Sequence, residues 1–526
     1  MQTFKSNCTL PPESVGFISS PNTRGTLDIV WSCLSVLILC TWSVIHLNVP
    51  IESTPNGKRQ EYTRKLFLFW TKLKWMFINL AAPEWALGQA WSLYHSVALL
   101  EDRFQKYQRE DSVPWSRSHI YYANMGGFSI RFDESLNEPE FSLQDVKPYE
   151  TNLFSPLNYG YPPQGFRPLP RAQRQFFDLW MMNGIDSPEH IQESVRKISK
   201  SIGDINWKPD QYNIRAIRMA VFILSPDHFA DEKERKKFFF NSETWFENIR
   251  YLCGDLWVLD ANQLLLARER GIIETLPSIS QASLDDRNKG NLFVTLLTIF
   301  QISWMVIQLI VRLALNLPSS QLEIVTLSFA ICSTITYLLL FNKPKDVQTS
   351  HTIKAAKRPS AEDLILIANA GPSGFAFARA SIWIPNNILS RDTTHREDGN
   401  FMMYLASSAA MIIFGGIHCI AWNFKFPTEV EKLCWHISTI ITAVTVPLLW
   451  ALNQTRGKVI ELIVMSDTDR SLLAKVASVI QKASWLIVLV FSSARLFITV
   501  EAFRSLAFLP PGAFLGTWSA GIPHVG

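Results

Sequence analysis

The residues best able to do chemistry in this 526-residue chain are ionisable side chains within or beside long apolar runs. A charged group at membrane depth is costly unless it is paired, so each of these residues is a candidate for function. Carboxyl and imidazole groups in a water-poor site suit proton transfer. The set comprises Asp28, His46, Glu84, His95, Glu323, His418, His436, Arg495 and Glu501.

Glu84 is the leading candidate for a catalytic acid. It follows Pro83, and proline tends to break a helix because it lacks a backbone donor. A carboxyl group at such a break, shielded from water, can keep its proton and donate it to a substrate. His95 lies about three helical turns further along, on roughly the same face. We therefore expect a catalytic site built on Glu84 with His95 beside it.

Asp28 and Glu323 are the other two candidate catalytic residues, and each has a structural alternative. Both lie at the start of an apolar run, where an acid in the first turn of a helix interacts favourably with the macrodipole. The sequence leaves both interpretations open. We expect His418 and His436 each to hydrogen-bond a neighbouring helix, and Arg495 and Glu501, on one helix, to pair with other helices.

Familiar cofactor and metal motifs are absent from the sequence. It has no P-loop, dinucleotide-binding glycine loop, zinc-protease helix or hydrolase nucleophile elbow. Asp467-Thr468-Asp469 has the spacing of a metal-binding pair, but a solvated loop explains it more simply. Asp285-Asp286 lacks the further acids with which diphosphate-ionising terpene synthases bind magnesium. We expect no metal and no cofactor, and packing roles for the seven cysteines, none of which forms a C-x-x-C pair.

The composition indicates a membrane protein. Charged residues make up 18% of the chain, and apolar residues concentrate in runs of about 20. This pattern excludes a disordered chain, a fibrous repeat and an ordinary cytosolic enzyme, and the net charge of +4 gives no argument for nucleic acid. We expect an all-α integral membrane protein with six to eight transmembrane helices and a largely helical polar insert. Six runs qualify as spans: 27–47, 292–312, 322–341, 401–422, 433–452 and 477–500.

The segment 75–98 decides the topology. It is apolar but contains Pro83, Glu84 and His95, so either a full crossing or a re-entrant path is open. Basic loops favour the cytoplasmic side, and the basic segments are 48–74, 343–400 and 453–476. A re-entrant 75–98 places all three there, and a further crossing hidden in the insert restores the same pattern. The re-entrant path makes the N-terminus lumenal, where Asn7-Cys8-Thr9 is a glycosylation sequon.

The predicted organisation has four parts. These are a polar tail over 1–26, the first span with the ambiguous segment over 27–98, a polar cytoplasmic insert over 99–291, and a transmembrane bundle over 292–526. Within the insert, 101–170 is rich in turn-forming residues. Ser187-Pro188-Glu189 has the order of a helix start, and a second helix is expected across 242–270. No β-rich domain is expected.

Several blocks of sequence carry a family resemblance. They are PNTRGTLDIVWSC at 21–33, CTW at 40–42, HLNVP at 46–50, YANMGGF at 122–128, QLEIVTL at 321–327 and IPHVG at 522–526. These blocks resemble a large family of fungal polytopic membrane proteins, and the resemblance covers nearly the whole chain. Some similar proteins act in fungal secondary metabolism, among them the membrane-bound terpene cyclase of the ascofuranone pathway and a norbornene-forming pericyclase of the sordarin pathway. The resemblance supplies no catalytic motif.

The resemblance implies a membrane-bound, cofactor-free cyclase of isomerase or lyase type acting on a lipophilic terpenoid or meroterpenoid intermediate. Acid-initiated opening of an epoxide needs a protonated carboxyl group, aromatic walls and a dry pocket, with Glu84 or Asp28 as the acid. A Diels–Alder-type pericyclase is one alternative, and a non-enzymatic receptor, scaffold or transporter is another. The expected partners are the substrate, membrane lipids and other pathway enzymes, in the endoplasmic reticulum as the default for an uncleaved anchor.

Overall fold

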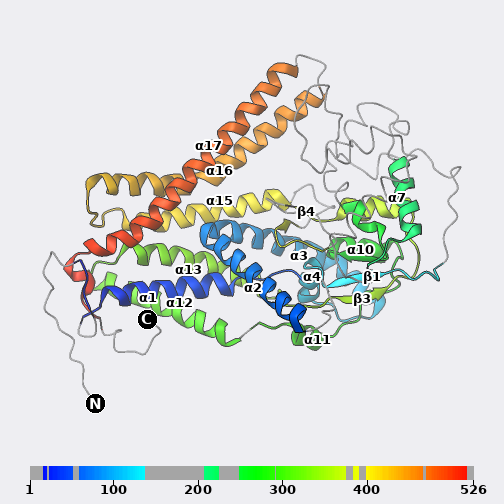
Figure 1. Ribbon diagram of the computed structural model, residues 1–526, viewed down its shortest axis with the longest axis horizontal. Helices are drawn as coiled ribbons and strands as arrows, with labels where there is room; N and C mark the ends of the chain where they lie inside the picture. The colour runs from blue at the N-terminus through cyan, green and yellow to red at the C-terminus, as the bar shows by residue number, and fades with distance from the viewer. Residues whose placement is uncertain are drawn as a thin grey trace.

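A computed structural model describes residues 16–19, 23–50, 58–136, 207–223, 248–290, 292–374, 383–389, 399–465 and 470–517. Thirteen α-helices dominate these residues, and strands are few. Figure 1 shows a bundle of long helices with a polar domain at one end of it. The expectation of an all-α integral membrane protein with a largely helical insert is confirmed.

Six helices within the described residues are long and apolar enough to cross a membrane. Each coincides with a run predicted to span, because about 20 apolar residues match the thickness of the hydrocarbon core. They are α1 (Thr26–Ser43), α12 (Leu292–Ala314), α13 (Gln321–Leu339), α15 (Gly399–His418), α16 (Glu429–Met465) and α17 (Arg470–Arg504). Of the six, α13 is the most buried, whereas α16 and α17 pair with each other and leave the bundle obliquely (Figure 1). Three short 3-10 turns flank the last spans: Cys419–Ala421, Ser505–Phe508 and Pro511–Phe514.

Two further helices form a hairpin beside the bundle: α2 (Lys58–Ala81) and α3 (Pro83–Asp111). The break falls at Ala82, whose φ of −147° and ψ of 71° are not helical, and Pro83 takes the first position of α3, where a missing N–H costs little. From this break α3 packs along α15. In Figure 1 α2 runs obliquely from the side of the polar domain toward the bundle, and α3 returns toward that domain.

The polar domain is built from the insert together with the segment that follows α13. Its helices and 3-10 turn are α4 (Arg117–Asn124), α7 (Gln211–Ile223), η4 (Arg250–Cys253), α10 (Ala261–Glu269), α11 (Gln281–Arg287) and α14 (Ala361–Ala370). Its strands are β1 (Phe128–Arg131), β2 (Leu256–Leu259) and β3 (His351–Lys354), in the order β2-β1-β3. Strand β1 is antiparallel to β2 and parallel to β3, so residues 343–374 belong with the insert. A two-stranded ladder pairs β4 (Ser373–Gly374) with β5 (Ile388–Leu389).

The helix expected across 242–270 is interrupted, and that expectation is wrong in its middle part. After η4 the chain is extended at Gly254, where a Cβ atom would lie 1.9 Å from Nε1 of Trp207. The β2 strand follows and pairs with β1. A new helix, α10, then starts at Asp260, whose carboxylate accepts a hydrogen bond from the backbone N–H of Gln263 at 2.8 Å. The helix predicted after Ser187 lies outside the described residues.

Candidate functional site

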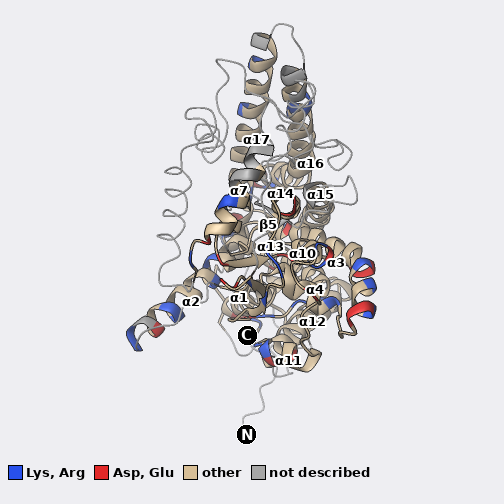
Figure 2. Ribbon diagram, turned by 90° about the vertical axis from the view of Figure 1, so that its right-hand side faces the viewer, with Lys and Arg blue, Asp and Glu red and all other residues tan. Residues whose placement is uncertain are grey.

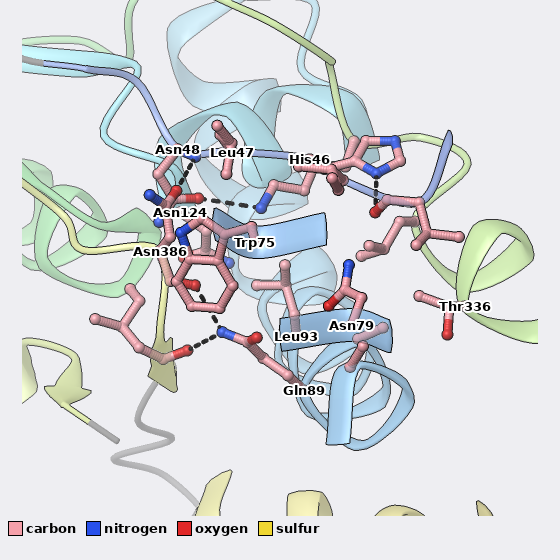
Figure 3. A pocket seen from close by; sticks show the side chains of 17 residues that line it. His46, Leu47, Asn48, Trp75, Asn79, Gln89, Leu93, Asn124, Thr336 and Asn386 are labelled. Carbon is pink, nitrogen blue, oxygen red and sulfur yellow. Dashed lines mark hydrogen bonds between the residues drawn. The ribbon is translucent and has the colours of Figure 1, made fainter. Parts of the chain in front are cut away.

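A small, partly open pocket with a cavity volume of about 80 Å³ lies where the bundle meets the polar domain. Its walls come from the end of α1, the α2–α3 hairpin, the end of α13 and the segment 383–389 (Figure 3). We call it the boundary pocket. It is lined by Val44, Ile45, His46, Leu47, Asn48, Trp75, Asn79, Ala86, Gln89, Ala90, Leu93, Asn124, Thr336, Leu340, Lys343, Asn386 and Ile388. This mixture of apolar side chains with a few polar groups is typical of small-molecule sites.

The strap that follows α1 forms one wall of the pocket. The helix ends at Ser43, and the chain continues without regular structure to Val49, whose N–H donates to the carbonyl of Met125 at 2.9 Å. His46 lies in this strap and donates from Nδ1 to the carbonyl of Val44 at 3.0 Å. Burial, reinforced by the positive charge of Lys345, lowers the pKa of His46 to about 3. The imidazole is therefore neutral at physiological pH.

Asn48 connects the strap to the segment 383–389. Its backbone N–H donates to Oδ1 of Asn386 at 2.6 Å, and its Nδ2 donates to the carbonyl of Pro385 at 2.9 Å. From α3, Gln89 donates to the carbonyl of Asn386 at 2.8 Å. Figure 3 shows Asn48, Asn386 and Gln89 along one side of the pocket, with His46 at the other end. These amides fix the wall in one geometry, because every bond joins segments far apart in the sequence.

Lys343 supplies the charge of the boundary pocket. It lies in the turn after α13, is 8% exposed, and donates from Nζ to Oδ1 of Asn48 at 3.1 Å. Burial lowers the pKa of Lys343 to about 8. No Asp or Glu is present among the described residues that line the pocket, so the ammonium has only a neutral partner there. A ligand oxygen placed against Nζ would satisfy this charge.

Two more donors at the pocket lack a partner among the described residues. They are Nε1 of Trp75, on α2, and Nδ2 of Asn124, at the end of α4. The other side-chain atom of Asn124, Oδ1, accepts from the N–H of Ala261 at 3.2 Å. Buried polar groups are nearly always hydrogen-bonded, so unpartnered donors mark places for acceptor atoms. Together with Lys343, they give the pocket three side chains that can donate hydrogen bonds.

Glu84, the leading candidate from the sequence, lies outside the pocket lining and is paired. The side chain is 1% exposed and forms an ion pair with Arg495 of α17. The guanidinium of Arg495 also lies 4.0 Å from the ring centroid of Phe414 on α15. One carboxylate oxygen of Glu84, Oε1, lacks a hydrogen bond among the described residues. The pair joins the hairpin turn to two spans.

The other three candidates do not join Glu84 in one site. Asp28 accepts from the N–H of Gly25 at 2.9 Å and so lies at the N-terminus of α1. Glu323 caps α13 through Ser320 and forms a buried ion pair with Arg24. Both residues therefore act at helix starts, the structural alternative stated for them. His95 lies half-buried further along α3 and does not line the boundary pocket.

The remaining ionisable groups are tied to backbone or to their own helix. His418 donates from Nδ1 to the carbonyl of Phe414 at 2.6 Å, one turn earlier in α15, and His436 contacts the carbonyl of Trp422 at 2.8 Å. Glu501 lies 3.5 Å from Arg504 of its own helix. We expected His418 to bond a neighbouring helix and Glu501 to pair with another helix. Both expectations are wrong, because these side chains contact residues of their own helices. No group of three or more His, Cys, Asp or Glu that could hold a metal occurs among the described residues.

Sequence reasoning named two pocket residues, His46 as an ionisable candidate and Trp75 as a possible aromatic wall, and missed Lys343, Asn48 and Asn386. Lys343 is the first cation after an apolar run, where a basic residue is ordinary at a membrane boundary, so it carries no distinct signal. The amides come from segments more than 330 residues apart. Only the folded chain brings them together.

A family model matches residues 2–146, 266–374 and 380–525. The chain belongs to the family of unknown function DUF8562. All residues that line the boundary pocket lie within the matched ranges, whereas residues 147–265 of the polar insert lie outside them. No curated protein and no solved structure matches the chain.

Proposed function

We propose that this member of DUF8562 is a membrane-bound enzyme that cyclises or isomerises a lipophilic, oxygen-bearing small molecule in the boundary pocket. The observation that carries the proposal is the buried ammonium of Lys343, which faces a pocket with unpartnered donors and no carboxylate among its described lining. Such a pocket at the end of a transmembrane bundle is accessible to a substrate dissolved in the membrane. The resemblance to membrane-bound cyclases of fungal secondary metabolism supports the same reaction class.

Lys343 takes the role of acid that the sequence assigned to Glu84 or Asp28. A group titrating near the working pH is well suited to give a proton in the transition state, and the pKa of Lys343 is lowered to about 8. The ammonium protonates an epoxide oxygen as its C–O bond breaks, and an alkene electron pair forms the new C–C bond. The resulting cation loses a proton to the Lys343 amine. The product is an isomer of the substrate, and the lysine is restored.

The other lining residues position the substrate. Nε1 of Trp75 and Nδ2 of Asn124 are free to donate to further substrate oxygens. The apolar side chains of Leu93 and Leu340 contact the hydrocarbon part, and the Trp75 indole stabilises developing positive charge. A pericyclic reaction would use the same enclosure without proton transfer. It is the second candidate because hydrogen bonds of the Asn and Gln side chains hold the pocket wall in place before a substrate binds.

We also propose a multi-pass arrangement in the endoplasmic reticulum membrane with the polar domain in the cytoplasm. The hairpin begins and ends on the side of the polar domain (Figure 1), which supports a re-entrant path for 75–98. The basic segments 48–74, 343–400 and 453–476 support the same orientation. Lumenal glycosylation of Asn7 would follow from it.

The test uses microsomes with the full chain and a panel of prenylated epoxides and lipophilic polyenes, with products read by mass spectrometry. Lys343→Met removes the ammonium, and Lys343→Arg keeps a positive charge that does not release its proton at neutral pH. We expect the wild type to form a product with the same mass as the substrate, and neither variant to form it. Of the two variants, only Lys343→Arg should still bind the substrate. Lys357→Met, at an exposed position of the polar domain, is the matched control.

The outcomes separate the candidates. Conversion that survives in Lys343→Arg but not in Lys343→Met points to anchoring and a pericyclic reaction. Equal conversion by both variants and the wild type would remove Lys343 from the reaction. Binding without conversion across the panel would leave a receptor or carrier as the function.

A further inference from the structure

We propose that the outer half of α2, residues 58–70, is a binding surface for acidic phospholipid headgroups. The ligand class is the anionic lipid of the leaflet that faces the polar domain. This inference stands apart from the proposed reaction, since it concerns the outer end of a helix whose inner end reaches the boundary pocket.

Contacts with the rest of the protein concentrate at the inner half of α2. Lys72 donates to Asp346 at 2.8 Å, and its Nζ lies 4.7 Å from the ring centroid of Trp42. Trp75 and Asn79 line the pocket. Toward the outer end the helix leaves the body of the molecule, and Figure 2 shows it projecting sideways with charged residues at its tip.

The outer half combines cations with exposed large apolar side chains. Tyr62, Phe67 and Trp70 are 69%, 67% and 57% exposed. Lys58 and Arg59 are exposed and have no carboxylate partner among the described residues, and Lys65 pairs only with Glu61 one turn away. Aromatic rings and cations on one projecting helix are the pattern of an interfacial helix, with rings at the acyl boundary and cations at the phosphates.

Physical reasoning favours a lipid surface over water as the surroundings. A helix that projects with five large apolar side chains exposed to water has little to stabilise it, because most helical stability in proteins comes from packing of an apolar face. The bilayer covers that face. The cations outnumber the acid on this stretch, since Lys58, Arg59, Arg64 and Lys65 accompany the single Glu61. This excess selects acidic headgroups over zwitterionic ones.

The experiment is hydrogen exchange, read by mass spectrometry, on the full chain in lipid nanodiscs. One set contains phosphatidylcholine alone and the other about 30% phosphatidylserine, an acidic content that gives the surface a negative potential. We expect amides of 58–70 to exchange on the order of tenfold more slowly in the acidic discs at low salt. High salt removes that difference, and peptides from α3 exchange alike in both discs.

Two variants test the surface, one that reverses the charges and one that neutralises them. Lys58→Glu/Arg59→Glu/Lys65→Glu abolishes the lipid-dependent difference, and the milder change of all three residues to Gln reduces it if the first variant folds poorly. The matched control reverses three exposed lysines of the polar side, Lys106, Lys354 and Lys357, and keeps the difference.

Equal protection of 58–70 in both discs would overturn the choice of acidic lipid. Fast exchange in both would overturn the membrane surface altogether and leave a protein as the occupant. Neither result bears on conversion at Lys343, so failure here is distinguishable from failure of the proposed function.

Discussion

Two buried charges in this molecule show opposite solutions to the same problem. Glu84, at the hairpin turn, is neutralised by Arg495, a residue 411 positions away. Among the described residues, the partner of Lys343 in the boundary pocket is the neutral side-chain amide of Asn48. A buried charge is costly unless it is paired, so the charge of Glu84 is compensated within the protein whereas that of Lys343 has no counter-charge among the described residues. The comparison teaches that burial alone is a weak criterion for a candidate site, and that a missing counter-charge is the sharper one.

The largest expected effect is the loss of one partner of the Glu84 pair. Arg495→Met leaves a carboxylate buried without a counter-ion, and we expect a loss of about 3–5 kcal/mol in the free energy of unfolding. Thermal unfolding of the protein in detergent, followed by tryptophan fluorescence, measures it. The double variant Glu84→Gln/Arg495→Met should recover much of the loss, since neither residue 84 nor residue 495 then carries a charge.

The matched control for this pair is the exposed pair on α2. Lys65→Met removes the partner of Glu61, whose carboxylate remains in water. We expect no measurable change in the unfolding temperature. Similar unfolding temperatures for Arg495→Met and Lys65→Met would contradict the view that the Glu84 pair holds the hairpin in the bundle.

Lys343→Met should raise the free energy of unfolding, the opposite of the loss expected for Arg495→Met. The folded-state pKa of about 8 lies below the ordinary value of 10.5, so folding disfavours the charged lysine at neutral pH. We expect the variant to be more stable at pH 7 by about 1–2 kcal/mol, the relief of burial less the lost bond to Asn48. Product formation is lost at the same time, as at other sites where function costs stability.

The pH dependence of this gain gives a second check. Between pH 8 and 10.5 the unfolded chain holds one more proton on Lys343 than the folded chain, so wild-type stability rises with pH across that window. The advantage of Lys343→Met is therefore complete below about pH 8 and disappears as the pH approaches 10.5. A gain that stays constant across the window would show that packing, and not charge, is its cause.

The contrast between the two sites also explains what the sequence predicts and what it misses. Spans are predictable because length and apolarity are local properties, and all six predicted runs match helices. Helix-start acids are local too, and Asp28 and Glu323 both cap helices. Glu84 stands out in the sequence because of its neighbour Pro83, but its partner Arg495 has no local relation to it.

The boundary pocket depends on long-range contacts that no local pattern encodes. Asn48 and Asn386 are ordinary amides in irregular segments, and Lys343 is an ordinary cation after a span. The three-stranded sheet was missed for the same reason, since β1 finds partners in β2 and β3 far along the chain. A candidate site recognised by a missing counter-charge requires knowledge of all neighbours, which only the fold provides.

A further predicted effect concerns the packing of α3, the helix that contributes to both sites. α3 carries Glu84 at its start and Gln89 of the pocket wall, and Gly88 lies between them. A Cβ atom at Gly88 would lie 1.9 Å from Oγ of Ser407 and 2.7 Å from the carbonyl oxygen of Met403. Gly88→Ala therefore pushes α3 away from α15, with a loss of about 1–3 kcal/mol in stability from overpacking.

Gly416→Ala is the matched control, because it lies on α15 with no atom within 4 Å of its would-be Cβ, and we expect no loss. Adding Ser407→Ala to Gly88→Ala removes the nearest clash but leaves the backbone oxygen of Met403, so recovery should be partial.

Because Gln89 follows Gly88 directly, displacement of α3 also loosens the hydrogen bonds of Gln89 to the segment 383–389. Unfolding temperatures and substrate retention of the three variants measure both effects. Full stability with lost retention would separate the pocket wall from the ion pair, whereas a parallel loss shows that α3 holds them as one unit.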